Sequence, residues 1–288
     1  MAFAVTTLIV VAQAAGAVLT GSLALLTDTA HALTDGTGLL VALVAATLML
    51  RPADSRRTWG FRRIEVIAAL GQATLLLGVG MYTAIEGVQR LFDPPDVSGH
   101  HLLAFGIAGL AANLLAIAIL TSARSANFNM RAAFLEVLND ALGSVGVIVA
   151  AIVIATTGFD RADTIAGLFI TALIVPRAVI LMRETLRVLM EFTPPGLDLE
   201  AVREHILSQE HVRDVHDLHA SMVATGLPTL TAHVVVDEVC FTDGHAAEVL
   251  ERIKRCVAEH FEVAVHHCTF QIETAAISMR ELATLKHA

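Results

Sequence analysis

Six long apolar runs divide the first two thirds of the chain. Each has about 18 or more predominantly apolar residues, enough for a helix to cross a hydrocarbon core of about 30 Å. The runs are Ala2–Leu19, Ala30–Leu50, Ile64–Ile85, Leu102–Leu120, Ala132–Thr157 and Thr164–Met182. The pattern therefore predicts six transmembrane helices. A cleaved secretory signal is the weaker interpretation of the first run, because no basic residue precedes it and its apolar character continues to Leu26.

The arginines between these runs predict the orientation of the helices. The loop after the second run holds Arg51, Arg56, Arg57, Arg62 and Arg63, the loop after the fourth holds Arg124 and Arg131, and Arg183 and Arg187 close the sixth run. The remaining loops hold only Arg90 and Arg161. Because short cytoplasmic loops carry the excess of Lys and Arg, both termini are expected in the cytoplasm.

After residues 193–196 the pattern becomes that of a soluble domain. It predicts, in order, a helix at Leu197–Ser208, strands at Val212–Val223 and Thr229–Asp237 around a turn at residues 225–228, a helix at Asp243–Phe261 and a strand at Val263–Ile272. The order αββαβ suits a small α+β sandwich. We therefore divide the chain into a six-helix transport domain (1–193), a cytoplasmic regulatory and dimerisation domain (194–276) and a C-terminal tail (277–288).

Composition separates the same two parts. The chain is 55% hydrophobic and 16% charged, which excludes an ordinary soluble protein. Of its 19 Lys and Arg and 28 Asp and Glu, residues 1–195 carry 12 and 13 and residues 196–288 carry 7 and 15, so the formal charges are −1 and −8. An acidic soluble part repels nucleic acid and attracts cations. Three cysteines give no disulfide framework and favour a reducing, cytosolic setting.

Charged residues inside the second and fifth runs predict a metal site. His31 and Asp35 lie in the second run, Glu136 and Asp140 in the fifth, and each pair is spaced i, i+4, so its members share one helix face. Charges in a bilayer are costly, and no Lys or Arg lies within these two runs to neutralise them. Two facing helices would present one imidazole and three carboxylates, a donor set for Zn²⁺, Co²⁺, Mn²⁺ or Fe²⁺.

Two other interpretations of these residues stay open. The first is helix packing, for example a protonated Glu136 that hydrogen-bonds to His31. The second is catalysis by a metal-activated water. A catalytic zinc normally keeps one position open by using three protein ligands, and the HExxH motif of helix-borne hydrolases is absent from the sequence. We therefore expect a protein that holds and releases an ion, not an enzyme.

Six stretches spread over nearly the whole chain resemble the cation diffusion facilitator family, most closely its cobalt-zinc-cadmium resistance branch. They are Gly21–Asp35, Arg57–Leu70, Asn129–Gly146, Val175–Arg177, His216–His219 and Thr269–Glu273. The resemblance implies a homodimeric metal/proton antiporter with six spans and a cytoplasmic ferredoxin-like domain. Its transport site would consist of His31, Asp35, Glu136 and Asp140. Many family members have His where Glu136 stands, so this chain's donor set is richer in oxygen.

The resemblance also bears on metal sites outside the membrane. The family's cytoplasmic ligands tend to fall where this chain has His216, His233, His245, His266 and Cys268. Imidazole and thiolate bind zinc well, but surface histidines and a buried cysteine are the alternative interpretation. His219 and His267 are further candidates, and strand alternation is expected to place each on the opposite strand face from its sequence neighbours. The loop at residues 51–63 has no His, so we expect no metal site there.

We therefore expect an exporter of divalent transition-metal ions, Zn²⁺ first and also Co²⁺ or Cd²⁺, in the inner membrane of a bacterium. Proton influx would drive it, because protons compete with metal for imidazole and carboxylate ligands. The expected partners are the lipid bilayer, metal ions, protons and a second copy of the chain, but no nucleic acid. No cofactor is expected apart from a regulatory Zn²⁺ in the cytoplasmic domain. The alternatives are a manganese or iron exporter of the same family, or a membrane-anchored metal sensor or scaffold.

Overall fold

The computed structural model describes residue 11, residues 13–121 and residues 128–285, apart from the side chains of some helical residues. Most of the first predicted span, Ala2–Leu19, lies outside this part, although residues 13–20 are helical. The chain forms two compact units, one of residues 1–47 and 68–183 and the other of residues 48–67 and 184–288.

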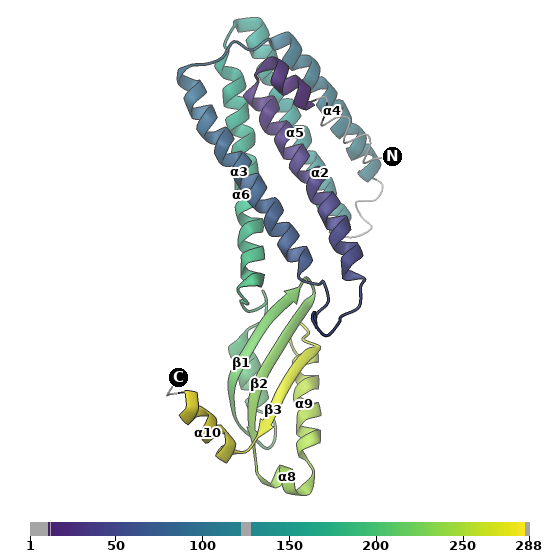
Figure 1. Cartoon of the computed structure of the whole chain (residues 1–288), viewed down its shortest axis with the longest axis vertical. Coiled ribbons are helices and arrows are strands. Elements are labelled where there is room, and N and C mark those ends of the chain that lie inside the picture. The colour runs from purple at the N-terminus through teal and green to yellow at the C-terminus, as the bar shows by residue number, and fades with distance from the viewer. Residues whose placement is uncertain (1–10, 12, 122–127, 286–288) are drawn as a thin grey trace. The chain divides into compact units, whose positions relative to one another are not determined.

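The first unit contains the long helices. They are α2 (Leu23–Met49), α3 (Ile64–Phe92), α4 (Gly99–Thr121), α5 (Phe128–Thr157) and α6 (Arg161–Leu189), drawn in Figure 1. Within the described residues, these five are long and apolar enough to cross a membrane. Large apolar side chains such as Leu43, Leu75 and Val149 are exposed on their surfaces, as a lipid-facing surface requires. A helical membrane domain is confirmed.

Helix α2 begins at Leu23, seven residues before the predicted start at Ala30, because a residue far away in sequence caps it. The N–H of Leu23 donates to Asp163 Oδ2 over 2.6 Å, and the Ser22 hydroxyl donates to Asp163 Oδ1. Asp163 and Ser22 are each only 1% exposed. The carboxylate thus satisfies N–H groups that a helix start leaves unpaired and offsets the positive end of its dipole. Asp163 has a structural role.

The second unit contains a small α+β domain. Its elements are α7 (Leu199–Leu207), β1 (Val212–Ala224), β2 (Leu227–Val236), α8 (Val239–Asp243), α9 (Ala246–Glu259), β3 (His267–Glu273) and α10 (Ala275–Leu285). The sheet has the order β1-β2-β3, with β1 antiparallel and β3 parallel to β2 (Figure 1). One face carries Val215 and Val234 into a core with Ile206 of α7 and Ile253 of α9. The predicted fold class is confirmed here too.

Every predicted element of this domain differs slightly in its bounds, and two differ by three or more residues at their start. The helix predicted at Asp243–Phe261 is interrupted by Gly244, whose φ of 90° requires the left-handed conformation that glycine adopts readily. Strand β3 begins at His267 and not at Val263. His267 pairs with Thr229, close to the start of β2 at Leu227, so Val263 and Ala264 would extend past the end of their neighbouring strand.

The arginine-rich loop at residues 51–63 belongs to this second unit. The Trp59 ring meets the His267 ring edge-on, with 4.7 Å between centroids. Arg63 donates to Glu191 over 3.0 Å. A hydrogen bond from Arg57 holds the pKa of Asp54 below its usual value and closes a tight turn in the loop. The Trp59 contact therefore holds the loop against the start of β3, and the Arg63 contact holds it to Glu191.

Candidate metal sites

Helices α2 and α5 meet at a charged pair. His31 Nε2 lies 3.3 Å from Asp140 Oδ1, and His31 is only 6% exposed. The structure thus brings together one predicted ligand from each helix. The side chains of the other two, Asp35 and Glu136, lie outside the described residues. A buried imidazole and a half-buried carboxylate at this distance hold a proton between them or share a metal ion.

A second close approach gives the relative direction of the two helices. A Cβ on Gly143 of α5 would stand 2.9 Å from Asp28 Oδ1 of α2. Since the contacts pair position 28 with 143 and 31 with 140, the helices run antiparallel. One further helical turn along the same register, of about four residues, sets positions 35 and 136 opposite each other.

Buried polar side chains continue from the charged pair toward the N-terminal end of α2. Asp28 and Gln13 are 6% and 5% exposed, and the Gln13 amide donates to Asp28 Oδ2 over 3.2 Å. Asn113 of α4 donates to Ser144 of α5, also over 3.2 Å. A Cβ on Gly109 would stand 2.7 Å from the Gln13 amide nitrogen, so only glycine leaves room there. None of these polar groups was among the predicted site residues; the available signal for Gln13 and Asn113 is a single amide side chain within an apolar run.

A second group of ligand-type side chains lies on the sheet of the small domain. Ligand atoms of His216, His233 and Glu273 all lie within 4.8 Å of one another. His216 Nε2 is 2.7 Å from Glu273 Oε1, and His233 Nδ1 is 3.6 Å from Glu273 Oε2. Glu273 is 1% exposed. Two imidazoles and a carboxylate form a donor set that suits zinc.

The strand register creates this group. His216 and His233 pair across β1 and β2, His233 pairs with Gln271 of β3, and Glu273 follows two residues later on the same face. The opposite face of the sheet holds the core. Ser278 of α10 lies 3.1 Å from His216 Nε2 and covers the group. Sequence analysis missed Glu273 as a ligand because the pairing of β3 with β2 is not visible in the pattern.

A β-bulge supplies another carboxylate at the edge of this group. The register shifts by one residue between His216 and His219, and Asp217 there has a φ of 51°. Asp217 Oδ2 lies 3.8 Å from His233 Nε2, and its Oδ1 lies 2.9 Å from His219 Nε2. Bulges commonly redirect a side chain in this way.

The other predicted cytoplasmic ligands lie elsewhere. His245 precedes α9, and a hydrogen bond with Asp243 raises its pKa. Cys268 packs against the core, and burial raises the pKa of its thiol. His266 is exposed and belongs to neither ligand group found in the described residues. The structure therefore brings together two of the five predicted residues, His216 and His233.

Comparison with known proteins covers both units. Residues 1–190 match the family model described as the cation efflux transmembrane domain, and residues 194–275 match the cation efflux protein cytoplasmic domain. The chain is 38% identical to the metal cation efflux system protein CzcD of Cupriavidus metallidurans, over 98% of this chain and 88% of that protein. It is 35% identical to a cadmium, cobalt and zinc/H(+)-K(+) antiporter of Bacillus subtilis, over 96% and 88%. It is 39% identical to the zinc transporter ZitB of Yersinia pseudotuberculosis, over 95% and 86%.

Proposed function

The chain belongs to the cation efflux family, and from this we propose that it exports divalent transition-metal ions, Zn²⁺ foremost and also Co²⁺ and Cd²⁺. It is an integral membrane protein, and its family is one of transporters. Relatives similar to it over nearly its whole length are named for the efflux of these metals. The single structural observation that carries the proposal is the contact between His31 and Asp140 inside the membrane helices.

The distance between these two side chains suits one shared ion. Two donors that each lie about 2.0–2.1 Å from a tetrahedral Zn²⁺ stand about 3.3 Å apart. The His31 and Asp140 atoms are already separated by 3.3 Å. The antiparallel register of α2 and α5 supports Asp35 and Glu136 as the remaining two ligands, one turn further along. The proposed site therefore has one nitrogen donor and carboxylate oxygens from three residues.

We propose proton antiport as the coupling. Imidazole and carboxylate bind metal only after losing their protons, so a proton that enters from outside releases the ion. Exposure of the site to each side in turn would come from rocking of helices around a fixed midplane site. With both termini in the cytoplasm, α2 begins at the outer face, so Asp28 lies on the outer side of the site. The buried Asp28 carboxylate can take up a proton that enters from that side.

In the cytoplasmic domain, His216, His233 and Glu273 are proposed to hold a regulatory Zn²⁺. The domain is proposed to join two copies of the chain into a homodimer. Its formal charge of −8 makes two copies repel, and a bound cation on each reduces that repulsion. Transport remains the main proposal over a membrane-anchored sensor, because a sensor has no need of a histidine and a carboxylate in contact between two membrane helices.

Flux into proteoliposomes tests the transport proposal. Zn²⁺, Co²⁺, Cd²⁺ and Mn²⁺ are supplied in turn while internal pH is recorded with a trapped dye. The wild-type protein should move Zn²⁺ and protons in opposite directions. Asp140→Asn should abolish both movements, whereas Asp96→Asn, an exposed carboxylate in the α3–α4 loop, should change neither. Metal flux that moves no protons would refute antiport, and full flux in Asp140→Asn would refute the site.

The same assay separates the alternatives. A manganese or iron exporter would move Mn²⁺ or Fe²⁺ and leave Zn²⁺ behind. A sensor would move no ion in any condition, and its output would depend on His216 and Glu273 alone.

A further inference from the structure

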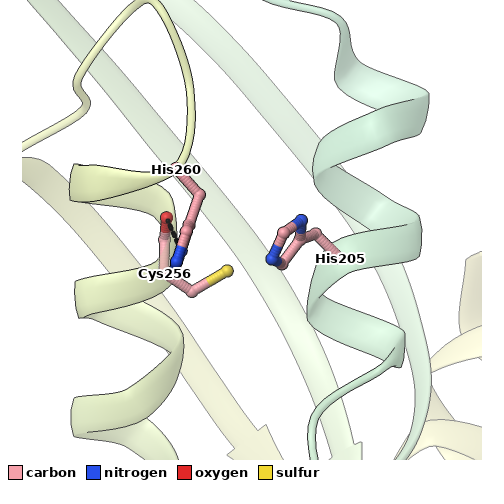
Figure 2. A group of neighbouring side chains, drawn as sticks. All are labelled: His205, Cys256 and His260. Atoms are coloured by element: carbon pink, nitrogen blue, oxygen red, sulfur yellow. Dashed lines mark hydrogen bonds between the residues drawn. The ribbon is translucent and has the colours of Figure 1, made fainter.

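A third group of ligand-type side chains lies in the helical layer of the small domain. His205 is in the last turn of α7, Cys256 is in α9 and His260 directly follows α9. One ring nitrogen from each histidine and the cysteine sulfur all lie within 4.8 Å of one another. Figure 2 shows the Cys256 sulfur in the space between the two helices, directed toward the His205 ring. None of these residues belongs to the transport site or to the His216 group.

Helix geometry explains why the three side chains meet. Cys256 and His260 are four residues apart, so they lie on one side of the α9 end. Helices α7 and α9 contact each other on the same face of the sheet, with Ile206 and Val257 completely buried in the core. His205 precedes Ile206 in sequence and therefore lies at the seam between the helices.

The hydrogen bond at His260 leaves one of its nitrogens available as a ligand. His260 Nδ1 lies 3.2 Å from the carbonyl oxygen of Cys256, drawn as the dashed line in Figure 2. A carbonyl only accepts, so Nδ1 carries the hydrogen and Nε2 carries the lone pair. Metal-binding histidines are held in this way, with the second ring N–H donated to a backbone carbonyl or carboxylate. The His205 ring stacks 5.0 Å from the His260 ring, which keeps the two imidazoles together.

The electrostatic setting favours a cation. Both α7 and α9 end at this seam, and the C-terminal end of a helix carries a partial negative charge. Cys256 is 2% exposed, whereas His260 is exposed, so the group is buried at its sulfur and open to solvent at one imidazole. An ion therefore has a route of entry through the side of His260.

We propose that His205, Cys256 and His260 form a separate metal site that takes Zn²⁺ or Cd²⁺ and fastens α7 to α9. Two imidazoles and a thiolate select these borderline and soft ions over Mn²⁺ or Mg²⁺. Donors on one tetrahedral zinc stand about 3.3–3.6 Å apart, so the side chains must close by about 1 Å, with water as the fourth ligand. The Cys256 proton passes to solvent on binding. The site lies on the other side of the sheet from His216 and needs no transport activity.

Absorption of the metal–thiolate bond tests the site in the full chain. The detergent-solubilised protein is titrated with Cd²⁺, and near-ultraviolet charge-transfer absorption is followed. The wild type should show a band that corresponds to one thiolate ligand per chain. Cys256→Ser should abolish it, whereas Cys268→Ser, a control at a half-buried cysteine outside the group, should retain it. Replacement of both His216 and Glu273 should also retain it, because neither ligates this ion.

A second variant, at the exposed ligand His260, tests the site without a substitution in the buried core. His260→Gln removes one donor at the solvent-facing end and should weaken Cd²⁺ binding by about tenfold or more. His266→Gln, an exposed histidine outside the group, should leave the affinity unchanged. A wild-type protein without the band, a band that survives in Cys256→Ser, or equal affinity in His260→Gln and wild type would each overturn the proposal.

Discussion

Replacing Gly143 with alanine tests how closely α2 and α5 must approach for the proposed transport site to form. The added Cβ would stand 2.9 Å from Asp28 Oδ1. Ordinary contact begins at 3.4 Å, so the helices must separate locally by about 0.5 Å or the Asp28 carboxylate must turn away from Gln13. Overpacking of this kind typically costs about 1–3 kcal/mol.

Gly146→Ala is the matched control. It lies on the same helix, and a Cβ there would meet nothing within 4 Å. Both substitutions gain the same helix propensity, about 1 kcal/mol. The difference between the two variants therefore isolates the clash, and we expect Gly143→Ala to be less stable than Gly146→Ala by about 1–3 kcal/mol.

The functional effect should follow from the same displacement. His31 and Asp140 lie one turn from the clash. A longer distance between these two side chains should lower their affinity for a shared metal ion. If the whole cost of overpacking lowers the free energy of Zn²⁺ binding, about 1–3 kcal/mol corresponds to about a 5- to 150-fold rise in the Zn²⁺ concentration for half-maximal flux. Flux into proteoliposomes and thermal unfolding in detergent measure the two effects. Equal flux and equal stability in Gly143→Ala and Gly146→Ala would refute the reasoning.

Three further predictions concern other groups. Glu136→His replaces an oxygen donor by nitrogen and should lower Mn²⁺ flux relative to Zn²⁺ flux; an unchanged ratio would remove Glu136 from the site. Asp163→Asn weakens the α2 cap and should lower thermal stability by about 1 kcal/mol without changing ion preference, whereas Asp160→Asn serves as control. Asp243→Asn removes the negative charge that, together with the hydrogen bond, raises the pKa of His245, so His245 should lose its proton at lower pH in an NMR titration of the full chain; an unshifted titration would exclude the Asp243 charge as the cause.

The part of the proposed transport site that the sequence predicts is the part that helical spacing determines. An i, i+4 pair shares one face wherever the helix lies, which groups His31 with Asp35 and Glu136 with Asp140. The contact between His31 and Asp140 then depends on how α2 and α5 pack. Asp163 is different, because its partner Ser22 lies 141 residues away. No local pattern shows that a carboxylate on α6 caps α2.

The small α+β domain shows the same division. The family resemblance placed His216 and His233 among the candidates, but Glu273 joins them through the parallel register of β2 and β3, a long-range property. His205 and Cys256 meet because two helices pack at a particular place on the sheet. Periodicity identifies the buried face of each helix but does not say which residues meet across the seam between them.

The attachment of the loop at residues 51–63 has a spectroscopic consequence. Trp59 is the only tryptophan in the chain, and its ring lies 4.7 Å from that of His267 at the start of β3. The tryptophan fluorescence of the protein therefore comes from one position, in the loop that follows α2 and against the strand that carries Glu273. Protonation of His267 or any shift of β3 alters the surroundings of that single fluorophore. The native emission thus reports, without a label, on the connection between the membrane helices and the small domain.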